Sequence, residues 1–114
     1  MKKIVFVVGC MLCLASCSTQ KSLYSWYDSE DASYQYVKKG TEKTLEEAML
    51  QYDKVIKMQK GTRQVVPPGV NAEYGYLLYK AGKKDEGLAL LRAEIKAYPE
   101  SEKFISRIIK QLEK

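Results

Sequence analysis

The spacing of apolar residues along most of the chain is typical of helices. In the segment 44–57 the apolar side chains recur at steps of three and four, which places them on one helical face: Leu45, Ala48, Met49, Tyr52, Val55 and Ile56. The alternation of apolar and polar residues that marks strands is not sustained anywhere, and the hairpin dipeptides Asn-Gly and Asp-Gly do not occur. The pattern therefore predicts an all-α fold with about five helices.

Glycines and capping residues indicate where the first two helices begin and end. A first helix is expected from about Asp28 to Lys39, because Gly40 can take the left-handed conformation that ends a helix. A second is expected to begin at the segment Thr-Leu-Glu-Glu, where Thr44 and Glu47 have the spacing of a capping box.

Three more helices are expected after the turn signal Pro-Pro-Gly at 67–69. The third, about 71–81, is apolar almost all round, which indicates that other helices pack on both sides. Within it, Gly75 costs about 1 kcal/mol of helix propensity relative to Ala, so we expect that it lets another helix approach its backbone. The fourth is expected over about 85–98 and ends before a proline, and Ser101 can cap the fifth.

The first residues have the three parts of a secretory signal: two lysines, an apolar run over 4–14, and small residues before Cys17. The apolar run is too short for a membrane-spanning helix. The Leu-Ala-Ser-Cys sequence at 14–17 resembles the cleavage site of bacterial lipoprotein precursors. This resemblance implies removal of residues 1–16 and attachment of acyl chains, palmitate among them, to Cys17. The alternative is an ordinary signal peptide followed by an accidental Cys.

The expected organisation is a signal peptide over 1–16, a lipidated tether over 17–25 and a helical domain over 26–114. Ser18 stands where lipoproteins retained at the inner membrane commonly carry Asp, so the resemblance implies the outer membrane. The following residues lack the acidic cluster that some bacteria use for surface display. The expected location is therefore the periplasmic face of the outer membrane.

Charge and composition argue against several classes of function. Without residues 1–16, 17 basic residues face 14 acidic ones in an interspersed pattern, so nucleic acid is not an expected partner. The chain contains no His, the commonest general base and metal ligand at neutral pH. Cys10 and Cys13 form a C-x-x-C motif, but both lie in the apolar run that is removed. No enzyme activity, metal site, cofactor or small-molecule substrate is predicted.

Two carboxylates in tightly packed segments, Glu73 and Glu94, are the remaining candidates for chemistry. A buried carboxylate needs hydrogen bonds, and nearby tyrosine hydroxyls can donate them. We therefore expect a structural network at both residues, with an active site as the open alternative.

The second half of the chain resembles the tetratricopeptide repeat, a helix-turn-helix unit of 34 residues. The residues that carry the resemblance are Tyr74, Gly75, Gly82, Gly87, Leu91 and Pro99. The segments YQYVKKG at 34–40 and YLLYKAG at 76–82 align as two copies of the first helix of the unit. The resemblance implies antiparallel helix pairs, while Lys84 and Glu94 depart from the repeat pattern.

A repeat of this kind implies an inner groove lined by the first helix of each pair. The predicted groove residues are Tyr34, Val37, Lys38, Ala72, Tyr76, Tyr79 and Lys80. Tyrosine offers rigid contact area and lysine adds steering charge, so the groove is expected to bind a partner peptide or helix. The alternative is that these rings form core, or cover the N-terminal segment that contains Leu23, Tyr24 and Trp26.

Pro-Pro-Gly followed by AEYGYLL, a glycine turn and YPES resembles an uncharacterised family of bacterial lipoproteins, the domain of unknown function numbered 4810. This resemblance implies an envelope assembly with neighbouring lipoproteins, including ones similar to the curli-secretion channel. The predicted function is a non-catalytic outer-membrane lipoprotein that serves as a protein-interaction or assembly module. The alternative is a lipoprotein that binds the cell-wall polymer peptidoglycan through stacking of its aromatic residues.

Overall fold

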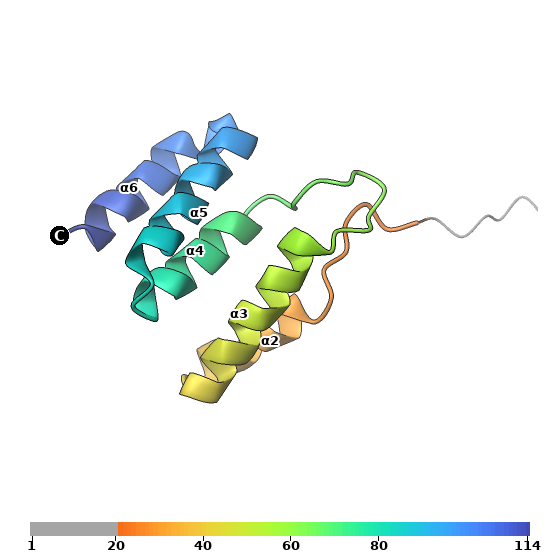
Figure 1. Cartoon of the computed structure of the whole chain (residues 1–114), viewed down its shortest axis with the longest axis horizontal. Helices are drawn as coiled ribbons and strands as arrows, with labels where there is room; N and C mark the ends of the chain where they lie inside the picture. Colours follow the sequence, from red (N-terminus) through yellow and green to blue (C-terminus); the bar gives the residue numbers. More distant parts are fainter. Residues whose placement is uncertain (1–20) are drawn as a thin grey trace, which may run out of the picture.

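The computed structural model describes residues 21–114, and within this range it is all-α, which confirms the predicted fold class (Figure 1). The helices are α2 (Ser29–Lys39), α3 (Glu42–Lys57), α4 (Val70–Lys80), α5 (Lys84–Ala97) and α6 (Glu102–Leu112), with a short 3-10 helix η1 (Pro99–Ser101) before α6. The predictions for the signal peptide and Cys17 concern residues outside the described range. None of the helices in residues 21–114 has the length and apolar character that a membrane span needs.

The helices form two consecutive hairpins, α2 with α3 and α4 with α5, and α6 packs against α5 (Figure 1). Both hairpin turns use a glycine at positive φ: Gly40 at +62° and Gly82 at +95°. Only glycine adopts this conformation without a steric cost, so it reverses the chain directly after a helix. The predicted ends of the first and third helices are thereby confirmed.

The core that joins the two hairpins lies between α3 and the start of α4. Its buried members come from α2, α3 and α4: Ala32, Ala48, Tyr52, Val55, Val70 and Leu77. They fall at the helical spacing that the sequence showed, since Ala48, Tyr52 and Val55 lie on one face of α3.

Gly75 on α4 and Gly87 on α5 bring the backbones of the two helices into direct contact. A Cβ added to Gly75 would lie 2.6 Å from the carbonyl oxygen of Gly87, and one added to Gly87 would lie 2.5 Å from that of Gly75. Both distances are far below van der Waals contact, so the two backbones touch only because neither residue has a side chain. The expectation that Gly75 admits a neighbouring helix is confirmed.

Two predicted caps are wrong. The capping box of α3 consists of Thr41 and Thr44: the Thr44 amide donates to the Thr41 hydroxyl (3.2 Å), and the Thr41 amide donates to the Thr44 hydroxyl (3.1 Å). Thr41 has the extended backbone that a capping residue needs, which starts the helix three residues earlier than predicted. Glu47 instead accepts a hydrogen bond from Gln51 (2.8 Å). Ser101 caps no helix, because its hydroxyl donates to the Tyr98 carbonyl (2.7 Å).

Residues 22–25, assigned to the tether by their polar sequence, are hydrogen-bonded to the loop between α3 and α4. Main-chain amides of Thr62 and Arg63 donate to the carbonyls of Ser22 (3.1 Å) and Leu23 (3.2 Å). The Ser25 amide donates to the side-chain oxygen of Gln59 (2.5 Å). Residues 22–25 are therefore part of the folded unit.

Candidate binding groove

An open, largely apolar cavity of about 480 Å³ lies between α2, α4 and α6, with α3 at its floor. Its lining residues are Ser33, Tyr36, Val37, Tyr52, Ala72, Glu73, Tyr76, Leu77, Phe104 and Ile108. Three of them expose large apolar side chains, because Val37 is 83% exposed, Phe104 67% and Tyr76 41%. We call this surface the groove. Exposed apolar groups on three separate elements around one hollow are typical of a binding surface for an apolar partner.

The structure brings some of the predicted groove residues together. Of the predicted groove residues, Val37 of α2 and Ala72 and Tyr76 of α4 line the groove. The Lys80 ammonium lies 5.7 Å from the centre of the Tyr76 ring, beside this wall. This contact is a cation–π interaction. Lys80 thus adds positive charge next to Tyr76 without lining the hollow.

The other predicted groove residues lie elsewhere. Tyr34 is 59% exposed and Lys38 is also exposed, but neither lines the hollow. The Tyr79 hydroxyl donates to the carbonyl of Leu112 (2.7 Å) at the end of α6, and its ring lies 5.6 Å from the Lys84 ammonium. Tyr79 therefore helps to hold α6 against the second hairpin.

Sequence reasoning missed the wall that α6 contributes. In α6 only Ile105 is buried. Phe104 and Ile108 point into the groove. The available signal was the width of the apolar stripe on α6, which is greater than a single neighbouring helix can cover.

A tyrosine and a carboxylate meet at the floor of the groove. The Tyr52 hydroxyl donates a hydrogen bond to the Glu73 carboxylate, and the Tyr52 ring stacks with Tyr74 at 6.4 Å. Burial, followed by the hydrogen bond to Glu73, raises the pKa of Tyr52 from 10.0 to about 12. The structural network predicted for Glu73 is confirmed by this contact.

Glu94 is a residue of α5 and is buried, with 3% of its surface exposed. Its side chain lies at the N-terminus of α4. One carboxylate oxygen, Oε1, accepts a hydrogen bond from the main-chain amide of Gly69 (2.7 Å), while Oε2 has no hydrogen-bond partner among residues 21–114. The predicted tyrosine partner is wrong, because the helix start supplies the donor. The positive end of the α4 dipole also favours a carboxylate at this position. Glu94 therefore ties α5 to the first turn of α4.

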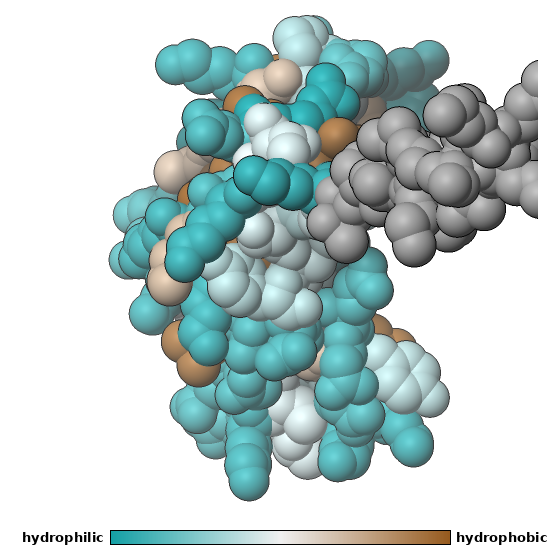
Figure 2. Space-filling model, turned by 90° about the vertical axis from the view of Figure 1, so that its right-hand side faces the viewer, coloured by the Kyte–Doolittle hydropathy of each residue, from teal (hydrophilic) through white to brown (hydrophobic). Residues whose placement is uncertain are grey.

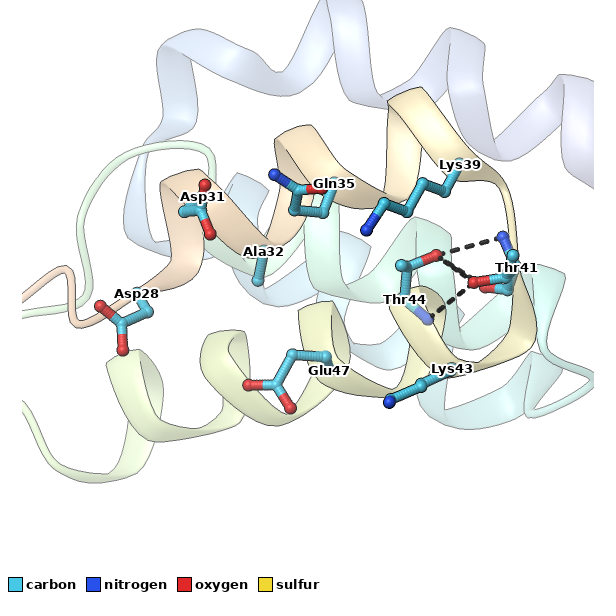
Figure 3. A pocket seen from close by; sticks show the side chains of 9 residues that line it. All are labelled: Asp28, Asp31, Ala32, Gln35, Lys39, Thr41, Lys43, Thr44 and Glu47. Carbon is cyan, nitrogen blue, oxygen red and sulfur yellow. Dashed lines mark hydrogen bonds between the residues drawn. The ribbon is translucent and has the colours of Figure 1, made fainter.

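A second pocket, of about 410 Å³, lies between α2 and α3 (Figure 3). The carboxylates of Asp28 and Asp31 line the end near the start of α2, and the ammonium groups of Lys39 and Lys43 line the end near the turn (Figure 3). Ala32, Gln35, Glu47 and the Thr41–Thr44 capping box complete its lining. In residues 21–114, no group of three or more His, Cys, Asp or Glu side chains is arranged to hold a metal ion.

The fold and the groove define an all-α protein built from consecutive helical hairpins, with an apolar hollow closed on one side by a C-terminal helix. The model of the family described as Domain of unknown function (DUF4810) matches residues 23–108, so the chain belongs to this family. The matched range begins in the N-terminal segment that is bonded to the α3–α4 loop and ends in α6, so it includes every wall of the groove. No curated protein and no solved structure matches the chain.

Proposed function

We propose that the protein is a lipid-anchored component of the bacterial outer membrane that binds another envelope protein in the groove. Its role is non-catalytic, and the partner is expected among neighbouring lipoproteins, including those similar to the curli-secretion channel. The observation that carries the binding role is the exposure of Val37, Tyr76 and Phe104 around one hollow. The lipoprotein cleavage pattern at 14–17 supports the anchor on Cys17 and the periplasmic location.

A tetratricopeptide-like architecture supports the same proposal. The two hairpins follow each other along the chain, and the small residues of the repeat pattern, Gly75 and Gly87, make the close contact between α4 and α5. In such repeats the first helix of each pair lines a concave surface. Here α2 and α4 hold these positions, and both line the groove.

The groove favours a partner that presents aliphatic or aromatic side chains, such as the apolar face of a helix. Val37 and Phe104 offer apolar contact on opposite walls, and burial of such side chains supplies most of the affinity in helix-in-groove complexes. The exposed carboxylate of Glu73 at the floor, already bonded to Tyr52, can accept one further hydrogen bond from the partner. The Tyr76 hydroxyl adds a second polar contact at the edge.

Photo-crosslinking in the native envelope tests this role. A benzophenone amino acid at position 104 is expected to crosslink to one defined envelope protein, and Val37→Asp is expected to abolish the crosslink. Leu50→Asp is the matched control, because Leu50 is 49% exposed on α3 and does not line the groove. Equal crosslinking in the two aspartate variants would contradict binding in the groove.

The anchor is tested separately by the mass of the purified protein. Cleavage before Cys17 with acyl chains on that residue gives a defined mass, and the protein is expected in outer-membrane fractions. An unmodified Cys17 would exclude the anchor without affecting the test of the groove.

A second candidate function, cell-wall binding, is favoured by the polar pocket between α2 and α3. Its carboxylates at one end and ammonium groups at the other complement a zwitterionic peptide, such as the stem peptides of peptidoglycan (Figure 3). Co-sedimentation with purified peptidoglycan that is lost in Lys39→Glu and kept in Lys96→Glu would favour this function. Sedimentation that is absent, or equal in the two variants, excludes the pocket as a cell-wall site.

A further inference from the structure

Large apolar side chains are exposed together at the end of the molecule where residue 21 enters the fold. Leu23 is 56% exposed, Trp26 36%, Tyr27 39% and Met58 50%. The Tyr27 hydroxyl donates to the Met58 carbonyl (2.5 Å), and the Leu23 carbonyl accepts from the Arg63 amide (3.2 Å). These contacts hold residues 22–27 beside residues 58–63. We call this surface, with Lys60 and Arg63, the anchor-side face.

Figure 1 shows residues 21–28 and the α3–α4 loop side by side at this end, and Figure 2 looks directly onto it. Pale residues of intermediate hydropathy, a class that includes Gly, Ser and Thr as well as Trp and Tyr, lie in the middle of the visible face among hydrophilic residues (Figure 2). Tryptophan and tyrosine are enriched where a protein surface rests in a membrane interface.

The two segments that form the anchor-side face are basic, although Trp26 also lines a small pocket with Glu30 and Glu73. The segments 21–27 and 57–66 contain Lys21, Lys57, Lys60 and Arg63 and no Asp or Glu. Lys57 forms an ion pair with Asp53 (3.0 Å), and the Arg63 guanidinium lies 6.0 Å from the Tyr24 ring. Lysine and arginine with aromatic neighbours match the anionic headgroups of phospholipids, and their long stems let the charge reach the headgroup layer.

Covalent geometry places this end next to the bilayer if Cys17 carries acyl chains. Three residues lie between Cys17 and Lys21, and the four residue-to-residue steps span at most about 14 Å when fully extended. The headgroup layer of one leaflet is about 5–8 Å thick, and charges act over about 8 Å at physiological ionic strength. The anchor-side face is thus the part of the described fold within reach of the lipids.

From this placement we infer that the anchor-side face docks on the anionic lipid headgroups, with Trp26 and Leu23 in the membrane interface. The inference rests on the proposed lipid anchor at Cys17. Docking fixes the orientation of the domain on the membrane, whereas a tether alone leaves the domain free to rotate.

Trp26 is the single tryptophan of the chain and reports on this contact directly. The mature lipoprotein is reconstituted into vesicles of phosphatidylethanolamine and phosphatidylglycerol that contain brominated acyl chains. Trp26 emission is expected to shift to the blue and to be strongly quenched. The variant Lys60→Glu/Arg63→Glu is expected to lose most of the quenching, with an unchanged circular dichroism spectrum.

Lys103→Glu/Arg107→Glu is the matched control, since it makes the same charge change on exposed residues of α6, outside the anchor-side face. It is expected to keep the wild-type quenching. If the protein floats with the vesicles but Trp26 is not quenched, the inference is overturned and the anchor is left intact. Equal quenching in the two double variants has the same meaning. If the mass shows no acyl chains but Trp26 is still quenched, the anchor is excluded and the docking of the anchor-side face is supported.

Discussion

The Tyr52 hydroxyl on α3 donates a hydrogen bond to the Glu73 carboxylate on α4, so one side-chain contact joins the two hairpins under the groove. Tyr52 is buried, with 4% of its surface exposed, whereas Glu73 is exposed to solvent beyond this contact. The contact therefore fixes the relative position of the hairpins and leaves a carboxylate facing the groove.

Tyr52→Phe removes the hydroxyl and keeps the ring. The free energy of unfolding is expected to fall by about 1–2 kcal/mol, because the variant loses a hydrogen bond to a charged acceptor. Water can partly replace this bond, which limits the loss. Urea denaturation measures the change. Tyr34→Phe is the matched control, since Tyr34 is 59% exposed, and it is expected to change stability by less than about 0.5 kcal/mol. Equal effects of the two substitutions would show that the Tyr52–Glu73 bond contributes nothing.

Stability is expected to fall at alkaline pH. Burial and Glu73 raise the pKa of Tyr52 from 10.0 to about 12, so above pH 10 the unfolded state loses a proton that the folded state keeps. The contribution of Tyr52 is fully present below pH 10 and is lost toward pH 12, at up to about 1.4 kcal/mol per pH unit. Burial raises the pKa of Tyr98 and of Tyr74 as well, so they act in the same direction. Denaturation midpoints measured across this range should fall less steeply in Tyr52→Phe than in the wild type.

Gly75→Ala is expected to destabilise the protein by about 1–3 kcal/mol, as overpacking of a close contact does. The added Cβ would lie 2.6 Å from the Gly87 carbonyl oxygen, so the α4 and α5 backbones must separate. Helix propensity alone would stabilise by about 1 kcal/mol. Ala89→Gly makes the reverse change at an exposed site of α5, so its loss of stability measures the difference in helix propensity alone. A stabilised Gly75→Ala protein would contradict the close approach of the two helices.

Glu94→Ala leaves the half-buried Gly69 amide without its side-chain acceptor, and a loss of about 1–3 kcal/mol is expected for such an unpaired donor. Glu94→Gln keeps an acceptor oxygen and should lose less. Glu100→Ala is the control at an exposed site, where a change within about 0.5 kcal/mol is expected. Thermal unfolding ranks the three variants by their stability. A Glu94→Ala protein as stable as Glu100→Ala would mean that the carboxylate does not cap α4.

Thr41→Ala removes the N-cap of α3 and is expected to cost about 1 kcal/mol. Thr62→Ala in the α3–α4 loop is the control. Thr62 is exposed, and it bonds to Ser22 through its main-chain amide, which the substitution keeps. Urea midpoints of the two variants distinguish them. If the helix instead began at Thr44, Thr41→Ala would behave like the control.

Much of the fold could be predicted because local chemistry determines it. Gly40 ended the first helix and Gly82 the third, since each takes a positive φ directly after the last turn. The role of Gly75 followed from its cost inside a helix. The start of α3 was predicted too late, because Thr44 has a plausible partner at Glu47, and only the extended backbone at Thr41 decides between two threonines.

The groove was harder to predict because its walls meet only in three dimensions. Val37 and Tyr76 were among the residues that the repeat resemblance implied, although their aligned counterparts Tyr79 and Tyr34 lie elsewhere. Phe104 reaches the same hollow through the turn at η1, and the sequence does not predict the direction of α6 after that turn. Glu94 shows the same limit. Its burial was expected from the repeat pattern, but its donor, the Gly69 amide, lies 25 residues away along the chain.

The hydrogen bonds between residues 22–25 and the α3–α4 loop have a mechanical consequence. A pulling force applied to the chain before Ser22 would load the bonds to Thr62 and Arg63 first. Tension would thus pass into the junction between the two hairpins before it could unwind α2. The domain therefore resists a pulling force on its N-terminal segment at the junction of its two hairpins.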